Sequence, residues 1–560
     1  MSGIAILVVS IVVLALGYVF YGGWLAKQWG VDPSRKTPAY EMEDGVDYVP
    51  AKAPVLLGHH FASIAGAGPI NGPIQAALFG WVPVLLWILI GGVFIGAVQD
   101  FSALFVSVRN KGMSIGEVME VHLNHKSKVM FSVFTWLVML LVDAAFADIV
   151  AKTFYYVEGS TNNGSVATAS LLFIPLAIAF GFLVYRRGVP LGISTVVGVA
   201  LLCGCVAAGL AFPLNYGSIN FWRVVVFVYC GIASVTPVWI LLQPRDYLNS
   251  FLLYFMIAAA VIGILGSNPT VILTPFNGFT VGNSMLFPTL FITVACGAVS
   301  GFHSLVGSGT TSKQLDQEKD AKPIAYGGML IECALALISV CAVGYIWNQY
   351  ADGTTTTPTV VFATGLASMF SKVFGDGCYN AVYSMLILAV SAFCLTSVDT
   401  ATRLARYMFA EFFVEPGKTR EDLTGWKRVI TNPYVATGIT VVAGVALGLT
   451  GYAKIWALFG AANQLLAALG LLAVCCWLGK VGRNNKMFYF PMFFMLIVTL
   501  TSLVFTIKAQ VVGIIAGGEG VVWCYVRGII GVLLVILAID LVVEGIRALG
   551  RNKKTAQAAE

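Results

Sequence analysis

Ionisable side chains lie inside several long apolar segments of this chain, where each could carry a proton or a charge. Asp100, Asp143 and His303 stand in runs of otherwise hydrophobic residues. A charged side chain costs about 2.5–3.5 kcal/mol at the centre of a membrane helix, so it needs a partner, a polar cavity or a proton. We therefore expect proton coupling at these three residues, with His59 and His60 as further candidates for a proton relay.

Two other buried charges have an opposite charge one helical turn away. Asp148 precedes Lys152 by four residues, and Asp399 precedes Arg403 by the same interval. Residues at this spacing face each other on a helix surface. We interpret both combinations as structural ion pairs.

The composition of the run from Gly58 to Pro73 is incompatible with a continuous helix, although its apolar surroundings predict one. Three glycines and two prolines fall within eight residues of a membrane-length apolar segment. Such a run frees backbone amides and carbonyls, and lipid cannot satisfy them. Unwound backbone at membrane depth is typical of the substrate or ion site of a secondary transporter. The substrate-binding candidates in this run are Ser63, Ala65, Gly66, Gly68 and Asn71.

A second interrupted helix is predicted near 221–243, where Pro237 follows a serine and a threonine. It comes five spans after the first, and the two helices would cross from opposite sides. That arrangement matches two inverted five-helix repeats, although a single proline kink is also common without function. Ser234, Thr236 and Gln243 complete the predicted substrate site between the two breaks.

A hydroxyl-rich stretch occupies the end of the helix predicted near 286–309. Its oxygens could bind a sodium ion together with freed carbonyls such as that of Gly66. Close packing of small residues, with hydroxyls bonded back to their own helix, is the structural alternative. The candidate ligands are Ser304, Ser308, Thr310 and Thr311.

Composition places the whole chain in a membrane. Of 560 residues, 58% are hydrophobic and 11% charged, with a mean hydropathy of +0.86, whereas soluble domains carry roughly 25% charged residues. The net charge of +6 comes from loop lysines and arginines, so we expect no nucleic-acid partner. Cysteines without CxxC spacing argue against a metal site, and five histidines leave no plausible haem pair. We expect no catalytic residue and no cofactor beyond a coupling proton or sodium ion.

Apolar runs predict about 15 spans of roughly 20 residues. They lie near 3–27, 55–79, 82–108, 129–154, 168–185, 190–212, 221–243, 249–267, 286–309, 325–349, 379–403, 434–450, 453–478, 487–509 and 520–546. Basic residues gather in alternate loops, which predicts an outside N-terminus and a cytoplasmic C-terminus. The short apolar segment 358–374 is predicted to be re-entrant or interfacial.

Several phrases of the sequence closely resemble the carbon starvation protein A family. They are His59–Ile70, Gly96–Phe101, Leu242–Leu248, Ser300–Ser304, Ser308–Thr311, Lys322–Gly327, Thr396–Arg403 and Ala462–Ala467. The resemblance implies a bacterial inner-membrane transporter linked to carbon starvation, with members associated with uptake of peptides and of pyruvate, the latter with protons. It also implies kinship with the amino acid–polyamine–organocation superfamily and an all-α, leucine-transporter-like fold.

Together these observations predict a cation-coupled importer of a small carboxylate or peptide. The expected parts are an extra helix at 1–28, repeats at 52–213 and 220–412, extra helices at 434–548 and a cytoplasmic tail at 549–560. Membrane lipid and a possible homo-oligomer are the other expected partners. A nutrient sensor and a redox or quinone-binding membrane subunit remain as alternatives.

Overall fold

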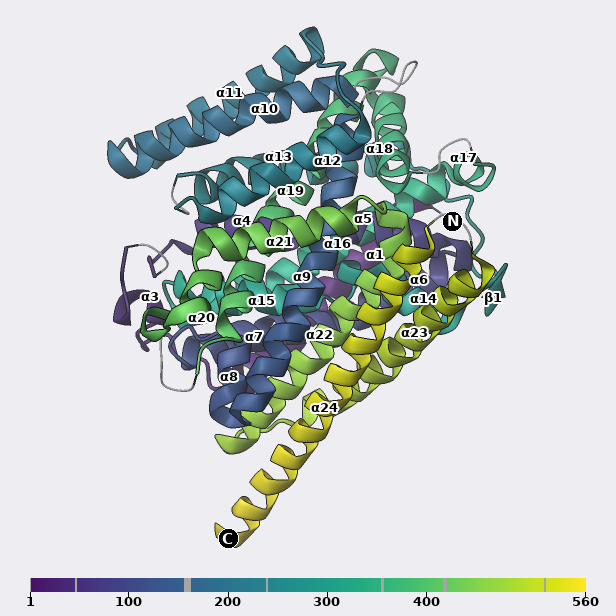
Figure 1. Ribbon diagram of the computed structural model, residues 1–560. Helices are drawn as coiled ribbons and strands as arrows, with labels where there is room; N and C mark the ends of the chain where they lie inside the picture. Colours follow the sequence, from purple (N-terminus) through teal and green to yellow (C-terminus); the bar gives the residue numbers. More distant parts are fainter. Residues whose placement is uncertain are drawn as a thin grey trace.

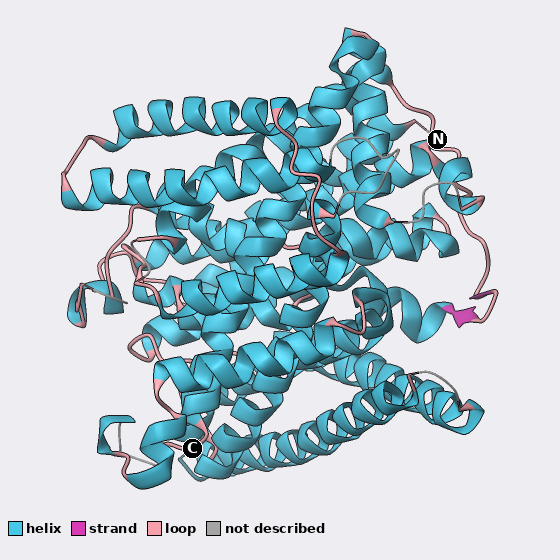
Figure 2. Cartoon of the chain, turned by 45° about the horizontal axis from the view of Figure 1, so that its top comes forward, coloured by secondary structure: helices cyan, strands magenta, loops and turns pink. Residues whose placement is uncertain are grey.

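The chain folds almost entirely into helices. A computed structural model describes residues 2–45, 48–155, 163–237, 240–353, 357–415, 420–517 and 520–559. In these ranges the only strands are the short antiparallel pair β1 (Thr280–Val281) and β2 (Ser284–Met285), which lies at one edge of the molecule (Figure 2).

Twelve helices of the described residues are long and apolar enough to cross a membrane, so the chain is a multi-pass membrane protein. Three shorter apolar helices accompany them, and this count does not confirm the expected 15 spans. The twelve are Gly3–Trp29, Trp81–Arg109, His125–Phe154, Gly164–Val184, Leu191–Ala211, Leu242–Ser267, Leu286–Lys313, Glu318–Tyr345, Asp376–Glu411, Ala453–Lys480, Lys486–Ala516 and Val521–Gly550.

The glycine- and proline-rich run does interrupt its helix. Helix α4 (Ala53–Ile64) ends at the first glycines, and α5 (Gly68–Ala76) begins after three non-helical residues. Pro69 lies in the first turn of α5, where a missing backbone N–H costs nothing. The glycines and the proline of this run therefore determine where the helix is interrupted.

A second break lies where a continuous helix was expected. The segment near 286–309 divides into α14 (Leu286–Val294), the 3₁₀ turn Ala295–Gly297 and α15 (Gly301–Gly309). Ala295 has a φ of 46° and Ser300 is extended, so the chain leaves helical geometry between them. The expectation of one unbroken helix here is wrong: α14 and the 3₁₀ turn pack on α5, and both α14 and α15 pack on α22 (Tyr452–Lys480).

The helix expected at 221–243 is also shorter than predicted. Helix α12 (Ile219–Val235) stops before Pro237, and α13 (Leu242–Ser267) is a separate full-length helix. Proline removes a backbone donor and disfavours helix at the preceding residue, which explains the stop. Pro237 therefore marks the end of a short helix and not the middle of a longer one.

Four helices form a scaffold beside the two broken segments. Helix α9 (His125–Phe154) packs along α19 (Tyr379–Glu411), and both contact α12 and α21 (Pro433–Gly448). The broken segments pack instead on α7 (Ala97–Arg109) and α16 (Gly327–Tyr345). Long α9 and α19 are largely buried, and α19 also contacts α4.

Other elements lie at the periphery. Helices α10 (Asn163–Gly181) and α11 (Leu191–Ala211) form a hairpin at one edge, and α23 (Tyr489–Ala516) and α24 (Val521–Ala559) lie together on another side (Figure 1). The segment predicted to be re-entrant is α18 (Pro358–Phe374), packed on α13, α16 and α19. The remaining helices are α1 (Gly3–Leu16), α2 (Gly23–Trp29), α3 (Pro38–Glu41), α6 (Trp81–Gly91), α8 (Ile115–His122), α17 (Trp347–Ala351) and α20 (Gly425–Ile430).

Candidate transport site

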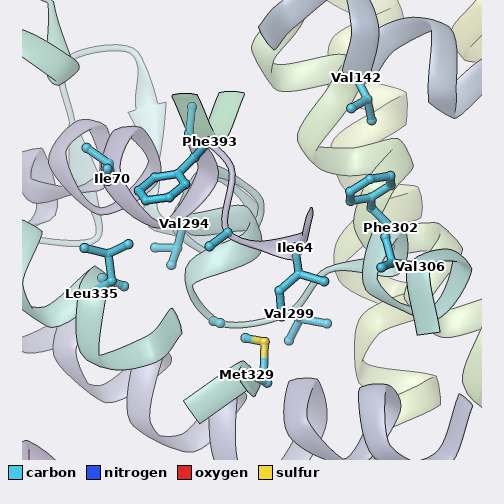
Figure 3. Packing of buried hydrophobic residues seen from close by; sticks show 14 of the residues in the cluster. Ile64, Ile70, Val142, Val294, Val299, Phe302, Val306, Met329, Leu335 and Phe393 are labelled. Atoms are coloured by element: carbon cyan, nitrogen blue, oxygen red, sulfur yellow. The ribbon is translucent and has the colours of Figure 1, made fainter. Parts of the chain in front are cut away.

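The two breaks face each other at the centre of the helix bundle. A Cβ at Gly68 would lie 2.6 Å from the Cβ of Cys296, and one at Gly72 would lie 2.5 Å from the Thr293 carbonyl oxygen. Only glycine allows so close an approach between the two chains. Figure 3 shows apolar side chains of both segments, among them Ile70 and Val294, in one packed region.

His303 is held between two carboxylates beside the second break. Its Nδ1 lies 2.7 Å from Asp100 Oδ2 on α7, and its Nε2 lies 3.2 Å from Glu332 Oε2 on α16. All three side chains are at most 1% exposed. The Glu332 contact has ion-pair distance, but both Glu332 oxygens lack a hydrogen bond within the described residues. The cluster therefore joins three helices through groups that can each bind a proton.

Neutral polar groups fix the geometry of this cluster. With its amide nitrogen turned toward them, Gln99 donates to Asp100 Oδ1 (2.7 Å) and to the Ser300 carbonyl (2.8 Å). Asn463 Oδ1 accepts from the Phe302 N–H (2.9 Å), and its Nδ2 donates to Ser300 Oγ (3.1 Å). Asn463 thus satisfies a backbone donor in the first turn of α15, as a capping residue does.

Cys296 brings a sulfur atom to the same place. Ligand atoms of Cys296, His303 and Glu332 lie within 4.8 Å of one another. The thiol is, however, already bonded to Ser300 Oγ and to the Asn463 amide. Cys296 therefore contributes to the hydrogen-bond network that surrounds His303.

Asp143 forms a separate buried acid on α9. It is 1% exposed, and its Oδ2 accepts a hydrogen bond from Thr402 on α19 at 3.2 Å. Its Oδ1 has no hydrogen-bond partner among the described residues. An ionised carboxylate with one donor is costly in such surroundings, so a proton on Asp143 stabilises the site.

A second charged cluster lies near the first half-helix. Arg245 on α13 contacts Asp399 (2.8 Å) and Asp246 (3.1 Å), and Asp246 also contacts His59 Nδ1 (3.2 Å). Arg245 donates further to the Tyr229 hydroxyl. The cluster links α4, α13 and α19 through groups that are almost completely buried.

The hydroxyls proposed for sodium mostly bond to their own helix. Ser304, Ser308 and Thr310 donate to the carbonyls of Gly301, Ser304 and Val306 at 2.6, 2.7 and 2.9 Å. Thr311 differs, because its Oγ1 lies 2.8 Å from His60 Nδ1. This pattern agrees with the structural alternative of back-bonding.

The substrate candidates divide into two groups. Those of the first break lie at the centre: the Ser63 carbonyl accepts from Ser397 (3.3 Å), a Cβ at Gly66 would touch Phe146, and Asn71 accepts from Thr359 (3.2 Å). Ala65 is fully buried in the same stretch.

The three candidates near Pro237 lie elsewhere. Ser234 lies 3.4 Å from Thr437 of α21, Thr236 bonds back to Ile232, and Gln243 contacts Gln314 at 3.3 Å. The structure therefore does not place these three residues beside Gly68. Cys296 lies beside Gly68 instead.

Of the two expected ion pairs, the structure contains one in the expected form. Lys152 lies 3.3 Å from Asp148, which also binds Arg223. Asp399 pairs with Arg245, while Arg403 donates to the carbonyls of Ala233 and Thr236, each at 2.7 Å. The predicted Asp399–Arg403 pair is wrong, because Arg245 of another helix is the ion-pair partner of the Asp399 carboxylate.

Three charged residues of these clusters were not among the site residues predicted from the sequence. Glu332 is a lone carboxylate in an apolar run, which is a signal that could have selected it. Arg245 and Asp246 follow a proline in a stretch that is typical of a loop, so no local pattern indicated that their side chains are buried.

Comparison with known proteins identifies the family of the chain. A family model described as carbon starvation protein CstA matches residues 2–353 and 348–502. "Peptide transporter CstA" of Escherichia coli is 35% identical, over 89% of this chain and 80% of that protein. "Pyruvate/proton symporter BtsT" of the same organism is 31% identical, over 86% and 78%.

A solved structure with a similar fold is the manganese transporter of Eremococcus coleocola. Its TM-score is 0.53 at 12% identity, with 91% of this chain and 99% of that chain covered. This similarity concerns the fold alone. On the family match and the two relatives, the resemblance noted in the sequence is confirmed, and the chain belongs to the carbon starvation protein CstA family.

Proposed function

We propose that this protein is a proton-coupled importer of small carboxylates, such as pyruvate, or of short peptides. The observation that carries the proposal is His303, bound between Asp100 and Glu332 at the second break. With the imidazole protonated and both carboxylates ionised, the cluster has one excess negative charge in a buried site. One further proton neutralises it, so proton binding and the packing of three helices are linked.

The arrangement of helices supports two inverted repeats with revised limits. We place them at 53–267 and 286–480, so that α4–α5 corresponds to α14–α15. The scaffold helices α9 and α12 then correspond to α19 and α21, which explains their mutual packing. Hairpin α10–α11 becomes an insertion in the first repeat. This division replaces the repeats expected at 52–213 and 220–412.

The same division accounts for the number of spans. The broken segment 53–76 and the short helices α12 and α21 join the twelve long helices, which makes 15 crossings. Basic loops then lie on one side, with the N-terminus outside and the C-terminus in the cytoplasm of the bacterial inner membrane.

The substrate site lies between the breaks, beside Gly66, Gly68 and Cys296. Freed amides at the start of α5 would bind a carboxylate, because helix N-termini attract anions, whereas at the start of α15 Asn463 already accepts from the Phe302 N–H. Entry of one monoanionic carboxylate with one proton moves no net charge, so the pH difference drives it, and each pH unit supplies about 1.4 kcal/mol, or roughly tenfold accumulation. That gradient suffices for scavenging a scarce nutrient.

Proteoliposomes that contain a pH dye test the proposal. We expect pyruvate or a dipeptide to accumulate under an inward proton gradient, with acidification of the lumen. Glu332→Gln should abolish accumulation but keep exchange of labelled for unlabelled substrate, whereas exposed Glu43→Gln should behave as wild type. Uptake driven by sodium alone would contradict proton coupling. Absence of flux would favour a sensor, and a Soret band in the purified protein would favour a redox subunit.

A further inference from the structure

An apolar groove lies between the N-terminal helix and α16, which are also in contact with each other. It has a volume of about 430 Å³ and is lined from one side by α1 and the following π-helical turn (Gly17–Gly22), and from the other by α16. Ile257 of α13 closes its floor. Ile11 and Ile331 on its two rims are exposed side chains of membrane-spanning helices, so the groove opens toward lipid.

The length of the groove matches one leaflet of a bilayer. Its α16 wall extends from Gly327 to Ile338, which is about 16 Å at the helical rise of 1.5 Å per residue. Half of a 30 Å hydrocarbon core is about 15 Å. A single acyl chain therefore fits from the membrane surface to the midplane.

A lysine stands at one end of this groove. Lys322 precedes the groove residue Pro323, and its Nζ lies 4.2 Å from the ring centre of Tyr18, another groove residue. Within the described residues Lys322 has no carboxylate within 4 Å. Tyr21 and Trp24 stack nearby, and aromatic rings of this kind mark the level of lipid headgroups.

We propose that the groove binds one anionic phospholipid, with an acyl chain between α1 and α16 and the phosphate on Lys322. The negative headgroup complements the lysine, and the tyrosine ring orients the ammonium group. The proposal assigns a role to the motif Lys322–Gly327, whose residues are not part of the transport site. The proposal does not depend on which substrate or ion is transported.

The groove is connected to the helices that carry the buried acids. The Tyr326 hydroxyl donates to Val93 O (3.0 Å) and contacts Gly17 O (3.4 Å), both in π-helical turns. Tyr326 itself ends a third such turn, Lys322–Tyr326. Three π-helical turns thus meet at one hydroxyl, and such turns are frequent at functional sites. A lipid in the groove would also support the face of α16 opposite Glu332.

Native mass spectrometry of the purified protein tests the proposal with two lipids of equal chains, phosphatidylglycerol and phosphatidylcholine. We expect one phosphatidylglycerol bound in preference. Lys322→Gln should weaken its binding about fivefold, the equivalent of the ~1 kcal/mol that one lysine contributes near an anionic surface. Lys322→Arg should keep the binding, and exposed Lys486→Gln should not change it.

A second variant tests the acyl-chain part independently of charge. Ala334→Phe fills the groove with a ring and should remove the bound lipid while Lys322 remains. Equal binding of the two lipids, or unchanged binding in both Lys322→Gln and Ala334→Phe, would overturn the proposal. Full competition by sn-glycerol 3-phosphate would also overturn it, because the site would then bind a phosphate without a chain.

Discussion

Replacing Arg245 by methionine should destabilise the protein by at least 3–5 kcal/mol. The guanidinium contacts Asp399 at 2.8 Å and Asp246 at 3.1 Å, and all three side chains are at most 1% exposed. Methionine fills a similar volume but leaves the buried Asp399 without its arginine and leaves Asp246 with His59 alone. Breaking one buried pair in this way typically costs 3–5 kcal/mol, mainly through the uncompensated charge.

The measurement is unfolding of the purified protein in mixed micelles by titration with denaturing detergent. Arg547→Met is the matched control, because that arginine pairs with Glu544 at the surface and should matter by less than about 1 kcal/mol. Adding Asp399→Asn to Arg245→Met should recover stability, since one unpaired charge disappears. The prediction is wrong if the free energy of unfolding of Arg245→Met lies within about 0.5 kcal/mol of wild type. It is also wrong if the effects of the two substitutions are strictly additive in the double variant.

Three further changes test the packing around the breaks. Gly301→Ala should cost about 1–3 kcal/mol in the same unfolding assay, because the added Cβ would lie 2.5 Å from the backbone nitrogen of Ala467. Gly204→Ala is the control, because open space surrounds Gly204 and the substitution should not destabilise the protein. Asn463→Leu should cost a similar amount by leaving a backbone N–H of α15 unpaired, and an unchanged midpoint would show that this bond is dispensable. Asp143→Asn should keep or raise stability while it impairs coupled uptake; full uptake would remove Asp143 from the coupling mechanism.

The sequence predicted the first break because its cause is local. Gly66, Gly68 and Pro69 disfavour a continuous helix through the break, whereas Pro73 is accommodated inside α5. The second break had a weaker local signal, since Ala295–Ser300 contains one glycine and no proline. It depends on packing between distant helices, which only the folded chain defines. Pro237 was informative about a helix end but could not tell whether the next helix was a continuation.

The charged residues show the same limit. Spacing along one helix shows which pairs can form, and Asp148 and Lys152 do lie 3.3 Å apart. Asp399 instead binds an arginine 154 residues earlier in the chain, because tertiary packing brings that cation closer. Burial of His303 in an apolar segment was visible from the sequence, whereas its two carboxylate partners required the arrangement of α7 and α16.

In the proposed mechanism, substrate binding is coupled to a proton at the cluster of Asp100, His303 and Glu332. The most direct test is proton uptake by the purified protein in weakly buffered solution, followed with a pH dye as substrate is added. We expect uptake of about one proton per bound substrate in the wild type, and none in a Glu332→Gln variant that still binds substrate. Equal proton uptake by the two proteins would contradict this mechanism.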